Sequence, residues 1–188
     1  FNPQWILRLG ESWRIRFIDL LMLWEDTGEK PREWLHLLVL KAKPDGGDRT
    51  IGLSVSRLRV WSKIRRPFAL AREKEHDDDF FFGCAGKPCE RASWGRSVIA
   101  GAAQGEGEAA AAFFLDHEEI YEMAQHREAT REAEANGFPM QLLHLALASY
   151  RGWRALEAGS TTTIPFRVQK TIIAGCSLAT SLAKILVR

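Results

Sequence analysis

The sequence has few cysteines, no long apolar run and no large excess of one charge. Its 188 residues contain three cysteines, an odd number at irregular spacing, which favours free thiols and a reducing compartment over a disulfide framework. No stretch approaches the roughly 18 consecutive apolar residues that a membrane span requires. The first residue is Phe1, and no signal peptide precedes the first amphipathic stretch. We therefore expect part of a longer intracellular protein, nuclear or cytoplasmic, that is not secreted and has no membrane partner.

Several common catalytic motifs are also missing. No Gly-x-x-x-x-Gly-Lys loop is present to cradle phosphates. Gly105 and Gly107 form a Gly-x-Gly pair, but this pair precedes an apolar run, whereas a dinucleotide site requires a preceding strand. Ser177 lacks the Gly-x-Ser-x-Gly elbow. Tyr121 stands where a zinc-protease helix would need its second histidine after His117. These motifs therefore do not identify the function.

The net charge of +2 is small, but the cations are unevenly distributed. One segment carries a basic stripe, which consists of Arg57, Arg59, Lys63, Arg65, Arg66 and Arg72. Such a stripe fits a groove for a polyanion, although a solvated helix face is the commoner meaning. Both interpretations stay open. The first makes five of these residues candidates for nucleic-acid binding: Arg57, Arg59, Lys63, Arg65 and Arg66.

Hydrophobic periodicity and turn residues predict a mixed α+β fold. The expected helices are Glu11–Asp26, Val55–Lys74, Glu90–Ala103, a polar stretch from Tyr121 to Asn136, Pro139–Tyr150 and Leu178–Val187. The expected strands are Trp34–Lys43, Arg49–Leu53, Arg154–Glu157 and Thr163–Val168. Pro67 should kink or split the second helix, because proline donates no backbone hydrogen bond. The first two strands should form a hairpin whose tip carries Lys41, Lys43 and Arg49.

The stretch from Ala109 to Glu122 is the most informative part of the chain. An apolar run ends abruptly at Asp116, and polar, helix-compatible residues follow at once. This pattern is typical of a buried strand that brings a carboxylate to its C-terminal end, where ligands and metals usually bind. Asp is also a favoured helix N-cap residue, so a capping role for Asp116 is the alternative.

Three segments together resemble one protein family. The segment from Lys43 to Leu53, Lys-Pro-Asp-Gly-Gly-Asp-Arg-Thr-Ile-Gly-Leu, resembles the Lys-Pro…Arg-Pro-Ile stretch in the fingers of reverse transcriptases of the non-LTR retroelement and group II intron type. The segment from Phe113 to Tyr121 is similar to the first catalytic motif of their palm, in which an apolar strand ends in Asp. The segment from Thr171 to Thr180 looks like their next motif, a glycine turn that opens a helix. The likeness extends from about Trp34 to the end of the chain.

The resemblance implies the fingers and partial palm of a right-hand polymerase, with an antiparallel sheet packed on helices and the thumb absent. It divides the chain into an N-terminal helical segment (1–33), a fingers-like region (34–108) and a partial palm-like region (109–188). Enzymes of this family transfer nucleotides with two Mg²⁺ ions that hold the attacking and leaving oxygens, and Mn²⁺ is the alternative ion. The implied partners are an RNA template, a DNA or RNA primer and a dNTP.

The resemblance also implies roles for individual residues. Asp116 would be the catalytic carboxylate and a metal ligand, assisted by the backbone carbonyl of His117. Arg49 and Lys43 would hold the triphosphate, and arginine suits this role because its guanidinium donates to phosphate oxygens in pairs.

Two further residues would contact the incoming nucleotide. Tyr121 would lie under the sugar, with an ordinary core tyrosine as the alternative, and Gly175 would let the backbone approach the template–nucleotide pair closely. The chain departs from the family at Thr50, where proline is usual, at Ile120, where a small residue is usual, and at Ile173-Ala174, where Pro-Gln is usual.

The family's second catalytic motif, an aromatic-x-Asp-Asp hairpin, is not reached before Arg188. We therefore expect a retroelement-derived fragment of an RNA-directed DNA polymerase that is inactive as this truncated chain. Two alternatives are a non-catalytic nucleic-acid-binding module that uses the basic stripe and a decayed relic of a polymerase.

Overall fold

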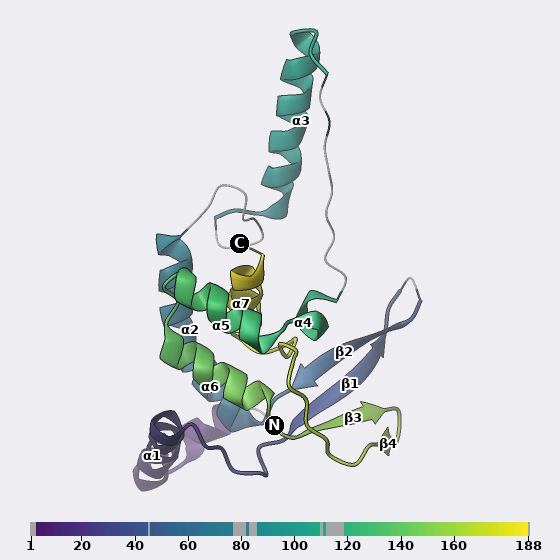
Figure 1. Ribbon diagram of the computed structural model, residues 1–188. Helices are drawn as coiled ribbons and strands as arrows, with labels where there is room; N and C mark the ends of the chain where they lie inside the picture. Colours follow the sequence, from purple (N-terminus) through teal and green to yellow (C-terminus); the bar gives the residue numbers. More distant parts are fainter. Residues whose placement is uncertain are drawn as a thin grey trace. The chain divides into compact units, whose positions relative to one another are not determined.

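The computed structural model describes residues 3–44, 46–76, 82, 86–109, 111 and 119–187. The chain forms two compact units, one made of Phe1–Arg72 with Glu119–Arg188 and the other of Glu73–Glu118. The first unit contains the β-sheet and most of the helices (Figure 1). The second contains helix α3 (Cys89–Gly105), which has no buried residue. The mixed α+β class predicted from the sequence is confirmed.

The described part of the first unit contains a four-stranded sheet with the order β2-β1-β3-β4. Its strands are β1 (His36–Ala42), β2 (Asp48–Leu53), β3 (Arg154–Ala158) and β4 (Thr161–Thr162). The predicted hairpin is present, because β1 and β2 pair in an antiparallel direction. The prediction of an antiparallel sheet is wrong at its centre, where β1 and β3 are parallel. The connection between these two strands is long and includes β2 and several helices, and a long connection permits parallel pairing.

Helices of the first unit gather on one side of this sheet (Figure 1). They are the 3₁₀ helix η1 (Pro3–Arg8) and the α-helices α1 (Glu11–Thr27), α2 (Ser56–Glu75, whose last three residues belong to the other unit), α4 (Ile120–Met123), α5 (His126–Ala135), α6 (Met140–Tyr150) and α7 (Ala179–Leu186). Gly28 ends α1 as predicted, since its φ of +70° allows its N–H to donate to the carbonyl of Trp24 at 2.8 Å.

Two helix predictions need correction. The helix α2 is not split at Pro67. The proline leaves the carbonyl of Lys63 without its helical donor, but both residues are exposed, so water can solvate that carbonyl. The polar stretch after Tyr121 is two helices instead of one. It breaks at Ala124 and Gln125, because the carbonyl of Ala124 accepts from Thr171 N–H at 2.8 Å and Gln125 pairs with Lys170.

The last predicted strand is also misplaced. We expected a strand over Thr163–Val168, but β4 is Thr161–Thr162, directly after the two-residue turn Gly159-Ser160. Pro165, which has no N–H, interrupts any longer pairing. Phe166 makes an isolated bridge with Arg154, in which each backbone N–H donates to the other carbonyl at 2.8 Å.

Three buried tryptophans join the N-terminal helix to the sheet and to α2. Trp24 of α1 meets Trp34, just before β1, with ring centroids 5.7 Å apart, and Trp61 of α2 at 4.5 Å, both edge to face. All three are at most 3% exposed. Aromatic rings bury large apolar areas, and edge-to-face pairs gain a further ~0.5–1.5 kcal/mol. This cluster therefore fixes the position from which β1 starts.

Candidate functional site

The β1–β2 hairpin brings cations together at its tip. Lys41 and Arg49 are directly opposite each other in the strand register, and Lys43 follows at the end of β1. All three are exposed, and among the described residues none of them forms an ion pair with a carboxylate. Like charges directly opposite on a strand pair repel. A bound anion would relieve this repulsion.

The predicted glycine turn lies against the same hairpin. Gly52 of β2 donates its N–H to the carbonyl of Ala174 at 2.9 Å. A Cβ on Gly175, whose φ is +100°, would lie 2.8 Å from the carbonyl oxygen of Gly52. A Cβ on Gly52 would lie 2.0 Å from Cγ2 of Ile173. Both glycines are therefore required for this close approach of two backbones.

The glycine turn meets β2 at Gly52, three residues along the strand from Arg49. Side chains alternate along a strand, so Arg49 and Ile51 point to one face and Gly52 to the other. A Cβ on Gly175 would lie 3.9 Å from Cγ2 of Ile51, which is two residues from Arg49. The sheet face that carries Arg49 is the more open one, as Lys41 and Leu53 on it are exposed.

Tyr121 is attached to the same turn. Its backbone carbonyl accepts from the N–H of Ile172 at 2.7 Å. Its side chain is half-buried and packs against the hydrophobic core, in agreement with the alternative that it is a core tyrosine. The segment that contains Gly175 thus bonds to Tyr121 through Ile172 and to Gly52 of β2 through Ala174.

Asp116 and His117, the predicted metal ligands, lie outside the described residues, as does most of the predicted strand that precedes them. The two described residues of that run, Ala109 and Ala111, are exposed and belong to no strand. Within the described ranges no group of three or more His, Cys, Asp or Glu side chains could hold a metal ion.

The basic stripe on α2 is partly exposed and partly engaged. Arg57, Arg59, Lys63 and Arg66 are exposed. Arg65 is different, because it donates from Nε to Oε1 of Glu25 at 2.6 Å and from Nη2 to Oε2 of the same carboxylate. The hydrogen bond from Arg65 is the main reason that the pKa of Glu25 is lowered. Arg65 therefore links α2 to α1. Its guanidinium is already paired with a carboxylate, whereas Arg57, Arg59, Lys63 and Arg66 are exposed.

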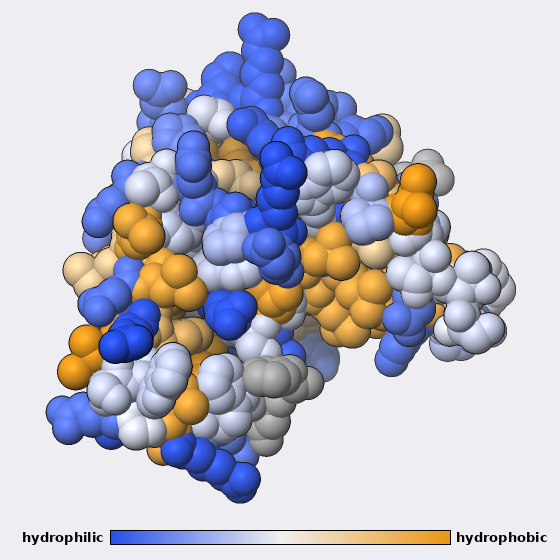
Figure 2. Space-filling model, turned by 90° about the horizontal axis from the view of Figure 1, so that it is seen from below, coloured by the Kyte–Doolittle hydropathy of each residue, from blue (hydrophilic) through white to orange (hydrophobic). Residues whose placement is uncertain are grey.

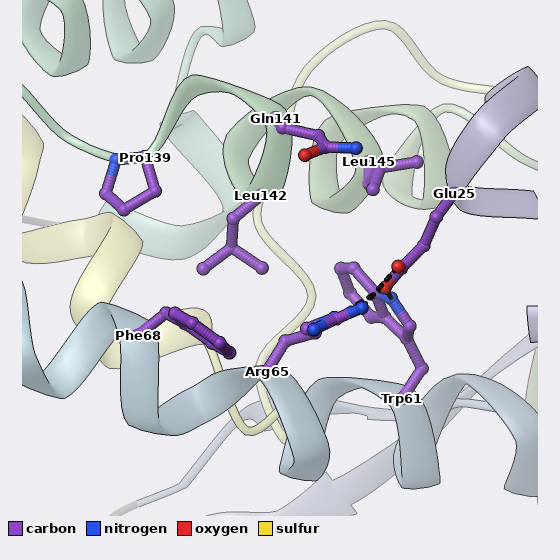
Figure 3. A pocket seen from close by; sticks show the side chains of 8 residues that line it. All are labelled: Glu25, Trp61, Arg65, Phe68, Pro139, Gln141, Leu142 and Leu145. Atoms are coloured by element: carbon purple, nitrogen blue, oxygen red, sulfur yellow. Dashed lines mark hydrogen bonds and ion pairs between the residues drawn. The ribbon is translucent and has the colours of Figure 1, made fainter. Parts of the chain in front are cut away.

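A pocket of about 170 Å³ lies beside this ion pair (Figure 3). Its lining residues come from α1, α2, α6 and the residue before α6, and they are Glu25, Trp61, Arg65, Phe68, Pro139, Gln141, Leu142 and Leu145. In Figure 3 the Arg65 side chain reaches across toward Glu25, and the Trp61 indole donates to the same carboxylate at 2.6 Å. The pocket contains none of the predicted substrate-binding residues, and its wall is mostly apolar.

Sequence reasoning missed a buried polar network at the C-terminal end of α6. Lys30 Nζ donates to the carbonyl of Ser149 at 2.9 Å, and His36 Nε2 lies 3.0 Å from the same oxygen. Arg154 donates from Nη2 to the carbonyl of Tyr150 at 2.5 Å. Together with the N–H of Gly152, which donates to the Ser149 carbonyl at 3.0 Å, these groups satisfy the free carbonyls at the C-terminus of the helix.

Burial explains the ionisation of this network. It lowers the pKa of Lys30 to about 8 and the pKa of Arg154 to about 10, because the charged forms lose hydration. It lowers the pKa of His36 to about 3, so this imidazole is neutral. A lone His or Lys at these positions gives no local sequence signal, because the partners come from distant segments.

Hydrophobic side chains also reach the surface in the described regions, among them Trp13, Ile18 and Ile164. Figure 2 shows hydrophobic patches separated by polar residues. None of the described helices is both long enough and apolar enough to span a bilayer.

We compared the chain with known proteins on the basis of its sequence. No protein-family model matches it, and no curated protein matches it significantly.

Proposed function

We propose that this chain is part of an RNA-directed DNA polymerase from a retroelement and that it binds the incoming nucleotide on the surface where the β1–β2 hairpin and the glycine turn meet. The observation that carries the proposal is the backbone contact between Gly52 and the turn Ala174-Gly175. This contact joins two of the three segments that resemble reverse transcriptases, although they are far apart in the sequence.

Each group has a chemical task in this proposal. Arg49 and Lys43 hold the triphosphate, whose negative charge offsets the repulsion between Arg49 and Lys41 on the exposed hairpin. Gly175 lets the turn lie close against β2, because a side chain at this position would meet the carbonyl of Gly52, and in this proposal its exposed backbone contacts the nucleotide. Tyr121, half-buried beside the turn, limits the space below the sugar.

The proposal also includes a metal ion. The carboxylate of Asp116 and the carbonyl of His117 are hard oxygen donors of the kind that Mg²⁺ or Mn²⁺ prefers, so these two residues would hold the ion. When bound, such an ion neutralises charge that develops on the phosphate during nucleotidyl transfer.

Nucleotide affinity tests the proposal. The binding of a fluorescent dNTP analogue to the chain in the presence of Mg²⁺ should weaken by roughly 10- to 100-fold in Arg49→Ala, since a hydrogen bond to a charged group contributes ~1.5–3 kcal/mol. The affinity of Arg49→Lys should lie between those of the unmodified chain and Arg49→Ala, because lysine keeps the charge but loses the paired donors. Arg8→Ala removes an exposed cation from η1 and should bind as tightly as the unmodified chain. Equal affinity in Arg49→Ala and Arg8→Ala would refute the assignment.

The basic stripe favours a second candidate, a nucleic-acid-binding module without catalysis. Arg59, Lys63 and Arg66 follow one another at helical spacing on α2, and all are exposed. Among the described residues, no carboxylate forms an ion pair with these three. Such a module would bind an RNA–DNA hybrid with an affinity that ignores both Mg²⁺ and dNTP, whereas the polymerase proposal requires a nucleotide site as well.

A further inference from the structure

Thr171, the residue that begins the segment leading to the glycine turn, has an unusual backbone conformation. Its φ is +85°, a region that L-residues with a branched Cβ rarely adopt. Glu119 is the other residue besides glycine with a positive φ in the described ranges. A strained conformation of this kind persists only where the surroundings hold it in place, and it is concentrated at functional sites.

The surroundings of Thr171 do hold it in place, at three separate atoms. Its N–H donates to the carbonyl of Ala124 at 2.8 Å. Its carbonyl accepts from Nε2 of His126 at 2.8 Å, and its hydroxyl accepts from Nη1 of Arg154 at 2.5 Å. The donors come from the first residue of α5 and the first residue of β3.

The side chains of His126 and Arg154 are themselves held by hydrogen bonds. Arg151 donates from Nε to Nδ1 of His126 at 3.1 Å, so Nδ1 is the acceptor and the proton of the neutral ring is on Nε2, facing Thr171. Arg154 is 3% exposed and is anchored by the carbonyl of Tyr150. Thr171 is thus held by two pre-oriented donors from different elements.

The backbone conformation of Thr171 determines where the glycine turn lies. Ile172 and Ile173, which follow it, are each 2% exposed, so they cannot shift without disturbing the core. Ile172 N–H donates to the carbonyl of Tyr121, and Ala174 accepts from Gly52. A change of φ at Thr171 would redirect this short segment at its start and would withdraw Ala174 from β2.

We propose that His126 and Arg154 are positioning residues: by holding Thr171 in its left-handed conformation, they place the turn Ala174-Gly175 against β2 at Gly52. We call the hydrogen bonds from His126 and Arg154 to Thr171 the latch. Its importance for nucleotide binding rests on the proposed function. The latch itself concerns the contact between Gly52 and Ala174 and is testable without any ligand.

Amide hydrogen exchange at Gly52 measures the latch directly, because that N–H is the donor to Ala174. In His126→Leu the exchange of the Gly52 amide should accelerate by about tenfold, as expected for the loss of one good hydrogen bond in the latch. His126→Gln, whose amide nitrogen can still donate to Thr171, should stay within about twofold of the unmodified chain. His144→Leu changes an exposed histidine of α6 and serves as the control.

The hydroxyl of Thr171 provides a second variant pair in case His126→Leu fails to fold. Thr171→Val keeps the branched shape but removes the acceptor for Arg154, whereas Thr171→Ser keeps the acceptor. We expect faster Gly52 exchange in Thr171→Val and near-normal exchange in Thr171→Ser. A purely structural role would accelerate the amides of the core by the same factor as Gly52. That result, or unchanged Gly52 exchange in both Thr171→Val and His126→Leu, would overturn the latch.

Nucleotide affinity separates the latch from the function on which it rests. If the unmodified chain binds dNTP, His126→Leu should raise the Kd by roughly 5- to 10-fold through displacement of Gly175, and His126→Gln should restore most of the affinity. If the unmodified chain binds no dNTP while Gly52 exchange still responds to His126→Leu, the latch stands and the proposed function fails.

Discussion

Gly175 combines two requirements that no other residue type meets. Its φ of +100° is costly for a residue with a side chain, and a Cβ there would lie 2.8 Å from a backbone oxygen of β2. Gly159 shares only the first requirement, since its φ is +61° and a Cβ there would have nothing within 4 Å. The two glycines therefore allow the effect of the close approach to be separated from the effect of backbone conformation.

This comparison leads to a prediction at the residue scale. Gly175→Ala should lower the free energy of unfolding by about 2–4 kcal/mol, because it adds overpacking to a strained φ. Gly159→Ala should lower it by about 1 kcal/mol, the approximate cost of the left-handed conformation alone. Urea denaturation of the two variants measures both values. If the two variants lose equal stability, the contact between the glycine turn and β2 does not constrain residue 175.

At the scale of single elements, α2 has two roles that its sequence does not separate. Arg65 is drawn inward by Glu25, and this contact raises its pKa above the ordinary value. Arg59, Lys63 and Arg66 stay exposed on the same helix. An exposed row of cations attracts the phosphates of a nucleic acid, and each phosphate contact releases a counterion.

The salt dependence of hybrid binding therefore tests α2. Replacement of Arg59, Lys63 and Arg66 by Gln should reduce the slope of log K against log[salt] by up to about 2–3, since each phosphate contact contributes ~0.7–0.9. Arg65→Gln should change this slope less and should mainly reduce stability, because it breaks the tie to Glu25. The measurement is hybrid binding at several salt concentrations. An unchanged slope in the triple variant would exclude α2 as the nucleic-acid-binding surface.

At the scale of the whole molecule, buried neutral histidines link folding to pH. Burial lowers the pKa of His36 to about 3, and burial also lowers the pKa of His126. Both folded-state values lie below the ordinary value of 6.5. The unfolded chain therefore binds more protons than the folded chain once the pH falls below about 6.5, and the folded state loses stability in this range.

We therefore expect the free energy of unfolding to fall between about pH 7 and about pH 5, by at most ~1.4 kcal/mol per pH unit for each histidine. The urea midpoint, measured across this range, reports the change. His36→Gln should flatten the dependence, whereas His144→Gln, at an exposed position, should leave it unaltered. A midpoint that is constant over this range would contradict the burial of two neutral imidazoles.

Much of the local structure could be predicted from the sequence. The end of α1 at Gly28 and the hairpin around residues 44–48 were predicted correctly, because glycine and proline act on their own backbone and on their immediate neighbours. The helix predicted to start at Pro139 starts at the next residue, Met140, with Pro139 as its N-cap. The close approach of Gly175 to β2 was not predicted, and its predicted approach to a template–nucleotide pair stays a prediction. The roles of Asp116 and His117 likewise stay predictions, as these residues lie outside the described part.

What the tertiary structure alone decided depends on contacts between distant segments. Three contacts join residues whose sequence neighbours give no sign of the partner. They are the parallel pairing of β1 with β3, the ion pair of Arg65 with Glu25, and the buried polar network at the C-terminal end of α6. The left-handed conformation of Thr171 belongs to the same group. Its residue type disfavours a positive φ, and hydrogen bonds with Ala124, His126 of α5 and Arg154 of β3 offset that local cost. Local patterns determine which elements form, whereas burial and long-range hydrogen bonds determine how those elements meet.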